Sequence, residues 1–287
     1  MLAIFGKEIK AYFCSATGYV FIGVFLLICG IFFANYNLLP ASPLYSNVLS
    51  SMTFLFLILV PILTMKLLAE EKYQKTDQLL LTSPLSVSEI VIGKYLASVS
   101  LFLITLLITV LYPLILSRFG TIPIGEITAT YIGFALMGAA FISVGIFVSS
   151  FTENQAIAAA ASFGILLLIW IMDWVQQGLP SGKTSGIVFA AVLLAGISTL
   201  LFTVLRNIIV SVLTIIIGSS IILIIFLKDS AVYEGFLPNF FGWFSLLKRF
   251  ENFGMGILDL GSVIYYISFS IVFVFFSIQM IEKRRWS

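Results

Sequence analysis

The chain has 287 residues, of which 61% are hydrophobic and only 10% charged, and its formal net charge is +2. Soluble domains are usually about 45–50% apolar and about 25% charged, so lipid must solvate much of this apolar surface. The small net charge gives no reason to expect nucleic acid as a partner. The absence of histidine removes the commonest metal ligand and the commonest general base at neutral pH.

Residues 1–18 are expected to form an interfacial N-terminal helix. Leu2, Phe5, Ile9 and Tyr12 recur at helical spacing, with charged residues between them. This helix either anchors the first membrane span or contacts a partner. Cys14 and the next cysteine would lie about 22 Å apart on one continuous helix, too far for a disulfide. The sequence therefore supports neither a disulfide framework nor a cysteine-based metal site.

A membrane-spanning helix needs about 20 mostly apolar residues, and the chain contains seven apolar runs long enough to be considered. They fall at Tyr19–Phe33, Val48–Leu68 (interrupted by Pro61), Leu96–Leu116, Ile127–Ser149, Ala156–Met172, Ile187–Leu227 and Gly261–Ile281. As one helix, the 187–227 run would measure about 61 Å, about twice the hydrocarbon thickness, so we expect two spans that turn near Arg206–Asn207. The predicted fold class is all-α: a polytopic transmembrane helical bundle of about eight spans, or six spans plus a re-entrant outer hairpin.

The segment Met65–Lys94 interrupts this apolar pattern with eight charged residues, in a chain that has 15 lysines and arginines and 13 aspartates and glutamates. Thr76 and Asp77 could begin a short helix that Pro84 prevents from continuing. Ser86 and Glu89 form the capping-box pattern S-x-x-E before an apolar stretch, which predicts a new helix running into the third span. Three consecutive leucines, Leu79–Leu81, would form an unusual apolar patch in an otherwise solvated loop.

Two acids near the ends of the fifth run are candidate substrate-path or gating residues. Glu153 lies in the link between the fourth and fifth runs, where a simple turn is the alternative interpretation. Asp173 lies near the other end, where water can also solvate an interfacial acid. Small residues in the fourth and fifth runs, including Ala160 and Gly164, would allow close helix approach, either within the bundle or at a dimer contact.

Residues 228–260 are expected to form an extracytoplasmic amphipathic segment. Leu237–Asp259 combines a run of aromatic residues with Lys248, Arg249 and Glu251, as in a helix lying at the membrane interface. Such a helix would anchor the chain, shape a substrate exit or dock an extracytoplasmic auxiliary subunit.

Orientation follows from the lysines and arginines, which concentrate on the cytoplasmic side of membrane proteins. With eight alternating spans and a cytoplasmic N-terminus, ten lysines and arginines face inward and five outward. We therefore expect both termini and the Met65–Lys94 segment to be cytoplasmic. A six-span core with an outer re-entrant hairpin has the same parity, so the charges do not settle the span count.

The segment also carries a family resemblance. Val60–Ser86 reads V-P-I-L-T-M-K-L-L-A-E-E-K-Y-Q-K-T-D-Q-L-L-L-T-S-P-L-S, and Glu89–Ala97 reads E-I-V-I-G-K-Y-L-A. These residues resemble the cytoplasmic loop of type-2 ABC (ATP-binding cassette) exporter permeases of the gliding-motility and multicopper-maturation type. Arg249–Leu260 and Glu282–Trp286 resemble the end of the same family. Lys75 departs from the pattern, because the family usually has glycine there.

The resemblance implies a single permease domain over residues 1–287 in a bacterial cytoplasmic (inner) membrane, with residues 69–94 as its cytoplasmic coupling loop. It also implies an exporter subunit without its own ATPase site, paired with a second permease chain, identical or paralogous. Two copies of a separate ABC ATPase would bind ATP and magnesium, so this chain needs no cofactor. The implied ATPase-coupling interface comprises Glu70, Glu71, Lys72, Lys75, Thr76, Asp77, Leu79, Leu80, Leu81, Pro84, Glu89 and Lys94.

Two other functions remain as alternatives. A secondary transporter or channel not driven by ATP would need paired charges within its spans, which are nearly free of them. An intramembrane enzyme would need catalytic groups, yet histidine is absent and no carboxylate pair lies at a plausible depth. The resemblance leaves the exported substrate open, because related permeases handle lipids, peptides, glycans and hydrophobic drugs.

Overall fold

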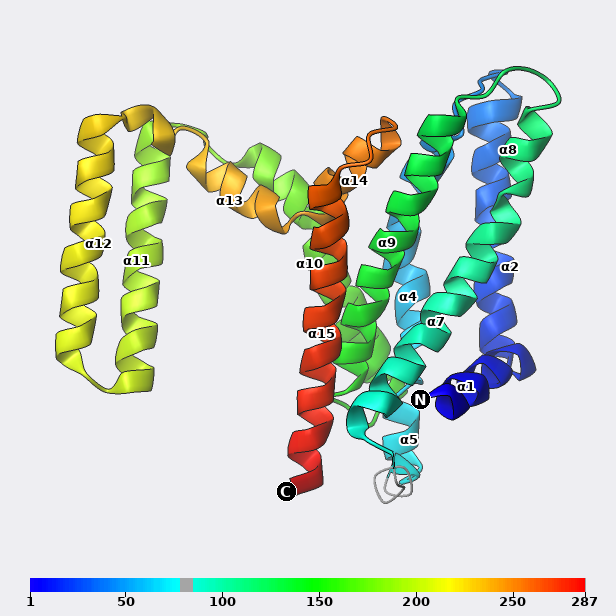
Figure 1. Ribbon diagram of the computed structural model, residues 1–287, viewed down its shortest axis with the longest axis horizontal. Coiled ribbons are helices and arrows are strands. Elements are labelled where there is room, and N and C mark those ends of the chain that lie inside the picture. The colour runs from blue at the N-terminus through cyan, green and yellow to red at the C-terminus, as the bar shows by residue number, and fades with distance from the viewer. Residues whose placement is uncertain (78–84, 287) are drawn as a thin grey trace. The chain divides into compact units, whose positions relative to one another are not determined.

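Figure 1 presents the computed structural model of the chain, which describes residues 1–77 and 85–286. Every regular element in these ranges is a helix. Eight helical segments there are long and apolar enough to cross a membrane, which confirms the predicted all-α polytopic bundle. The chain forms two compact units: unit 1 comprises Met1–Trp170 and Leu246–Ser287, and unit 2 comprises Ile171–Ser245.

Unit 1 begins with the predicted N-terminal helix. α1 covers Leu2–Cys14 and packs against α7 and α2. The chain is extended at Ser15, where φ is −111° and ψ is 154°, and then enters α2, Ala16–Phe33. A π-helical segment, η1 at Ala34–Leu38, ends the first span. Both cysteines of the chain are free thiols.

The second span contains several helical pieces, but the helix is not interrupted at the residue that the sequence analysis predicted. It comprises α3 (Ser46–Ser51), the 3-10 helix η2 (Met52–Leu55), α4 (Phe56–Thr64) and α5 (Ala69–Tyr73). The expected interruption at Pro61 is wrong: proline removes one backbone donor, yet α4 continues through it to Thr64. The helix is instead interrupted at residues 65–68, between the end of α4 and the start of α5.

The third and fourth spans form the centre of unit 1. α7, Val87–Thr109, begins with the predicted capping box, in which Ser86 and Glu89 satisfy each other's backbone N–H groups. α8 (Leu111–Leu116) extends this span, and α9 (Ile124–Ser149) follows. In α9, a Cβ at Gly138 would overlap Phe102, and one at Gly145 would overlap Thr64. These glycines therefore serve close helix packing inside the unit.

The remaining helices of unit 1 enclose an aromatic core. α10 covers Gln155–Gly178 and continues into unit 2, while α14 (Leu246–Gly254) and α15 (Leu260–Trp286) pack against α9. Phe56 and Phe134 lie at the centre of this core, with ring centroids 4.7 Å apart. Phe25 and Phe102 pack around them, so side chains from four different spans meet there.

Unit 2 contains the predicted hairpin. α11 (Lys183–Leu205) and α12 (Ile208–Lys228) pack against each other and turn at Arg206, which adopts a left-handed conformation. Asn207 caps α12 by accepting a hydrogen bond from the Ile209 N–H. The 3-10 helix η3 (Ser230–Tyr233) and α13 (Phe236–Phe244) follow.

The expected single amphipathic helix over Leu237–Asp259 is wrong. The backbone is extended at Ser245, with φ −70° and ψ 116°, and this residue separates α13 from α14. The two helices belong to different compact units. The aromatic run thus lies on the apolar α13, and the charged residues that follow it lie on a separate helix, α14.

Candidate functional site

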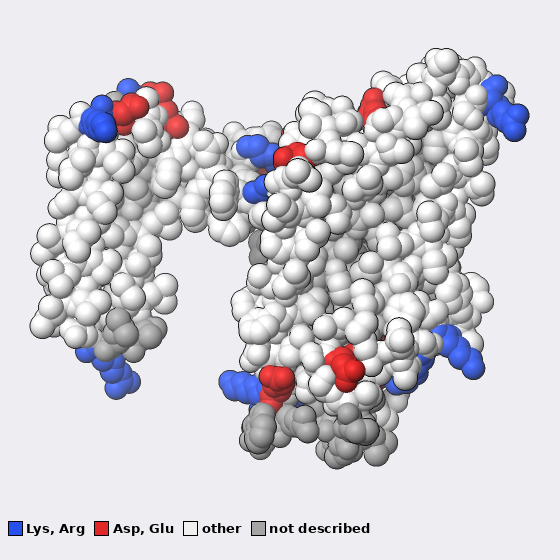
Figure 2. Space-filling model, viewed as in Figure 1, with Lys and Arg blue, Asp and Glu red and all other residues white. Residues whose placement is uncertain are grey.

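The charged side chains of unit 1 indicate where a polar partner could act. In Figure 2, the visible face of each unit, taken by itself, shows charged residues toward its two ends and an uncharged band between them. One end of unit 1 carries the base of the Met65–Lys94 segment, where α5 ends and α7 begins. The N-terminus of α1 also lies there, because the Met1 ammonium group is 3.3 Å from the Glu89 carboxylate.

α5 ends in a Schellman turn at Lys75, the position where the resembled family usually has glycine. The Lys75 N–H donates to the Lys72 carbonyl at 3.1 Å, and the Thr76 N–H donates to the Glu71 carbonyl at 2.9 Å. This pattern requires the first of the two donor residues to be left-handed, and Lys75 has φ +58°. Glycine adopts that conformation without a Cβ penalty, which is a physical reason for the family preference. Lysine keeps the turn but strains the backbone.

Substitution of Lys75 tests this turn. We expect Lys75→Gly to raise the free energy of unfolding by about 0.5 kcal/mol, because relief of the left-handed strain exceeds the extra entropy of unfolded glycine. Lys75→Val should lower it by about 1–2 kcal/mol, since a β-branched residue tolerates positive φ poorly. Thermal unfolding of the detergent-purified variants measures both. Equal effects of the two substitutions would show that φ at this position does not govern stability.

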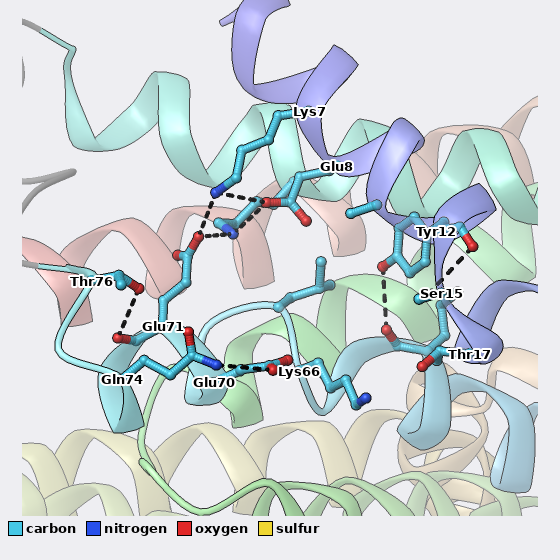
Figure 3. Close-up of a pocket in the computed structure, with 14 residues that line it drawn as sticks. Lys7, Glu8, Tyr12, Ser15, Thr17, Lys66, Glu70, Glu71, Gln74 and Thr76 are labelled. Atoms are coloured by element: carbon cyan, nitrogen blue, oxygen red, sulfur yellow. Dashed lines mark hydrogen bonds and ion pairs between the residues drawn. The ribbon is translucent and has the colours of Figure 1, made fainter.

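A buried group of charges joins three elements at the base of the segment. The Lys94 Nζ atom, on α7, lies 2.8 Å from both the Glu8 carboxylate of α1 and the Glu71 carboxylate of α5. The Lys94 side chain is only 2% exposed, whereas Lys7, which pairs with the same two carboxylates at 3.9 and 3.3 Å, is 60% exposed. We call Lys94, Glu8 and Glu71 the ion triad; Figure 3 shows its two carboxylates converging.

The triad borders a pocket of about 440 Å³. α1 supplies one wall, and Tyr12 fixes that wall because its hydroxyl donates to the Leu63 carbonyl at 3.2 Å. The same hydroxyl lies 2.9 Å from Ser98 Oγ. Burial raises the pKa of the Tyr12 phenol, so the hydroxyl stays neutral and remains a donor at physiological pH. Hydrogen bonds and ion pairs therefore fasten α1 to both sides of the segment's base.

The α9–α10 link contacts the other side of α5. Ser149 Oγ accepts hydrogen bonds from the Leu68 and Ala69 N–H groups, at 3.3 and 3.2 Å, where the chain passes from α4 to α5. The buried ammonium group of Lys72 donates to the Ser150 carbonyl. The Ser149 bonds satisfy two backbone N–H groups at the break between α4 and α5, and the Lys72 bond satisfies a carbonyl just after the end of α9.

The C-terminal end of α15 completes this end of unit 1. The Arg284 guanidinium lies 2.6 Å from the Glu153 carboxylate and 4.0 Å from that of Asp77. Glu153 thus lies at the same end of unit 1 as the base of the segment. Five parts of the chain meet here: α1, α5, α7, the α9–α10 link and α15.

One stretch of unit 2 partly resembles the nucleotide-binding pattern. Gly178–Thr184 reads G-L-P-S-G-K-T, one residue short of the phosphate-loop spacing G-x-x-x-x-G-K-[ST]. It joins α10 to α11, whereas a phosphate loop follows a β-strand. Lys183 pairs instead with Glu234 at 3.3 Å. Within the described residues, no group of three acids or cysteines could hold a metal ion.

Comparison with known families decides the class of protein. A family described as ABC-2 family transporter protein matches residues 3–184, which is more than half of the chain. The chain belongs to the ABC-2 family of transporter proteins. The match runs from α1 to the first residues of α11 and so contains the whole Met65–Lys94 segment. No curated protein matches the chain significantly.

Membership in the ABC-2 family fixes the coarse function. The chain is a multi-pass membrane permease of the ABC transporter type. Such permeases are transmembrane components that are generally not catalytic themselves and generally pair with an ABC ATPase. The match does not distinguish the gliding-motility and multicopper-maturation type from other ABC-2 permeases.

The residues proposed from the sequence fall into three groups in this ABC-2 permease. The structure brings together Glu71, Lys72, Lys94, Glu89 and Glu153 with the turn at Lys75 and Thr76, and it places Glu70 and Asp77 beside them. Leu79, Leu80, Leu81 and Pro84 lie outside the described residues. Asp173 belongs to unit 2, where its carboxylate accepts hydrogen bonds from Ser245 and Gln177 at 3.3 and 3.4 Å.

Sequence reasoning missed several members of this ABC-2 site. Glu8 was assigned only to an interfacial helix, and Arg284 only to the positive end of the chain. Ser149 carried no signal at all, because serine near a helix end is common. The signal for Glu8 was available in principle: an acid on an amphipathic helix can pair with a lysine inside an apolar span, and Lys94 is such a lysine.

Proposed function

We propose that this ABC-2 protein is the membrane-spanning permease subunit of an ATP-driven exporter, and that the Met65–Lys94 segment is its coupling loop. A separate ABC ATPase would dock on this loop and transmit its movement to the spans. The type resembled by the loop sequence, that of gliding-motility and multicopper-maturation permeases, is part of the proposal. The exported substrate remains open.

The observation that carries this proposal is the ion triad. Lys94 lies at the start of the third span and Glu71 at the end of the second, so their ion pair closes the base of the loop. Glu8 adds α1 to the same joint. Charged pairs in a poorly solvated site hold a fixed geometry more firmly than exposed pairs. A force applied to the loop would therefore move α1, α5 and α7 together, as a coupling element requires.

The proposed working unit contains two permease chains, identical or paralogous, and two ATPase chains. ABC ATPases act as a closing pair, and one coupling loop engages one ATPase, so a second permease loop is needed. The permease–permease contact would use membrane helices, where small residues allow close approach. Ala160 is exposed and Gly164 has open space around its Cα, so this part of α10 is available for such a contact.

The proposed orientation places the loop in the cytoplasm of a bacterial cell, with the multi-pass chain in its cytoplasmic membrane. The lysine and arginine imbalance supports this orientation. Residues 228–260 would then face outward, where an auxiliary subunit could bind. ATP and magnesium would be held by the ATPase chains.

The test is reconstitution with candidate ABC ATPases from the organism that carries this chain. We expect a detergent-solubilised complex whose mass equals two permeases plus two ATPases, and transport in proteoliposomes that requires ATP. The ATPase should bind inside-out vesicles and leave right-side-out vesicles unbound. Transport by the purified permease alone, driven by an ion gradient, would instead establish a secondary transporter.

A further inference from the structure

A second pocket of unit 1 lies at the end opposite to the coupling loop. It has a volume of about 530 Å³, within the range of small-molecule sites. The connection from η1 to α3 forms one side, with Asn37 and Ser42, and the connection from α8 to α9 forms the other, with Phe119 and Thr121. The residues that line it include no charged side chain. We call it the Asn37 pocket.

Asn37 is almost fully buried, with 1% of its surface exposed. Its Nδ2 group donates to the Ser42 carbonyl at 2.8 Å, and the Ser42 N–H donates to the Asn37 carbonyl at 3.0 Å. The Nδ2 bond fixes the orientation of the side-chain amide, because a flipped amide would direct its oxygen at the Ser42 carbonyl oxygen; the second bond is made to the backbone carbonyl of Asn37. The hydrogen bond to Ser42 gives the amide nitrogen of Asn37 a partner, but the amide oxygen has none from this connection.

The Oδ1 atom of Asn37 has no hydrogen-bond donor among the described residues. Buried acceptors are nearly always paired, so an unpaired one needs an explanation. Asn37 also lies in a π-helical turn, a type of irregularity frequent at functional sites. The pocket thus combines an unused acceptor with two hydroxyl side chains and the apolar side chains of Leu116 and Phe119.

We propose that the Asn37 pocket binds an uncharged amphiphile whose headgroup carries O–H or amide N–H donors. A donor at the floor of the pocket would pair with Asn37 Oδ1, and the headgroup would also meet the hydroxyls of Ser42 and Thr121. The apolar part of the ligand would lie against Phe119, whose side chain is largely exposed. The lining offers no charge to balance an ionic headgroup, so neutral ligands are selected. This inference does not depend on the proposed coupling to an ATPase.

The experiment compares two probes with the same alkyl chain on the full-length protein in lipid nanodiscs. Octyl glucoside, below its micellar concentration, offers hydroxyl donors, whereas octyldimethylamine oxide offers only an acceptor. Hydrogen exchange followed by mass spectrometry reports on residues 37–43 and 116–121. We expect octyl glucoside to slow exchange in both segments in a saturable manner, and the amine oxide to have no such effect.

A pocket-filling variant identifies the site. A Cβ at Gly120, which lines the pocket, meets nothing within 4 Å, so Gly120→Phe introduces a large side chain at the pocket wall without a clash at its Cβ. It should raise the dissociation constant for octyl glucoside by at least about tenfold. Gly125→Phe is the matched control, because Gly125 is equally open but does not line the pocket. Equal protection by the two probes, protection that survives Gly120→Phe, or no saturable protection would each overturn the proposal.

Discussion

Replacing Lys94 with methionine is expected to lower the free energy of unfolding by about 3 kcal/mol, because removing one partner of a buried ion pair leaves uncompensated charge. Lys94 is the only member of the ion triad that is almost fully buried, and it lies 2.8 Å from two carboxylates. Methionine keeps a similar volume, so the loss reports on the charge. The same variant should weaken coupling, since α1 and α5 would no longer share a partner on α7. Denaturant titration of the purified protein measures the first effect, and permease-stimulated ATP hydrolysis measures the second.

Lys7→Met is the matched control for this prediction. Lys7 lies beside the same two carboxylates but is 60% exposed, and exposed pairs contribute only about 0–1 kcal/mol. A Lys94→Met variant that also carries Glu8→Gln and Glu71→Gln should recover part of the loss, because no unpaired carboxylate remains. Equal destabilisation by Lys7→Met and Lys94→Met would show that burial of the charge is not the cause.

Local signals in the sequence predicted the parts of the fold that depend on neighbouring residues. The capping box at Ser86 and Glu89 is an example, since both partners lie within one turn. The hairpin followed from the length of the apolar run, which is too long for one span, and Arg206, the only charged residue in that run, gave the position of the turn. The departure at Lys75 was visible as a mismatch with the family pattern, and the left-handed backbone there gives its physical meaning.

Contacts between distant residues could not be read from the sequence in the same way. Glu8 and Lys94 are 86 positions apart; their opposite charges made a pair chemically possible, but no local signal indicates that α1 folds against α7. The break at Ser245 was missed for a related reason. The apolar α13 and the charged, amphipathic α14 follow each other directly in the sequence, and a single helix was predicted across both, whereas tertiary packing assigns them to different units. Pro61 shows the converse error, because a helix supported by packing on both sides tolerates one lost hydrogen bond.

Replacing Leu80 with aspartate is expected to abolish recovery of the ATPase with the permease while leaving membrane insertion intact. Leu80 is the middle residue of the leucine run Leu79–Leu81 in the proposed coupling loop, outside the described residues. A carboxylate forced into an apolar contact without a partner costs on the order of several kcal/mol. That is comparable with much of the roughly 8 kcal/mol that holds a micromolar complex. Co-purification from mild detergent measures the loss.

Leu39→Asp is the control: Leu39 is 79% exposed at the opposite end of unit 1, so this variant should retain the ATPase. Normal recovery with Leu80→Asp would place the docking surface elsewhere, and α1 would then be the surface to test, because the ion triad fastens it to the base of the same loop.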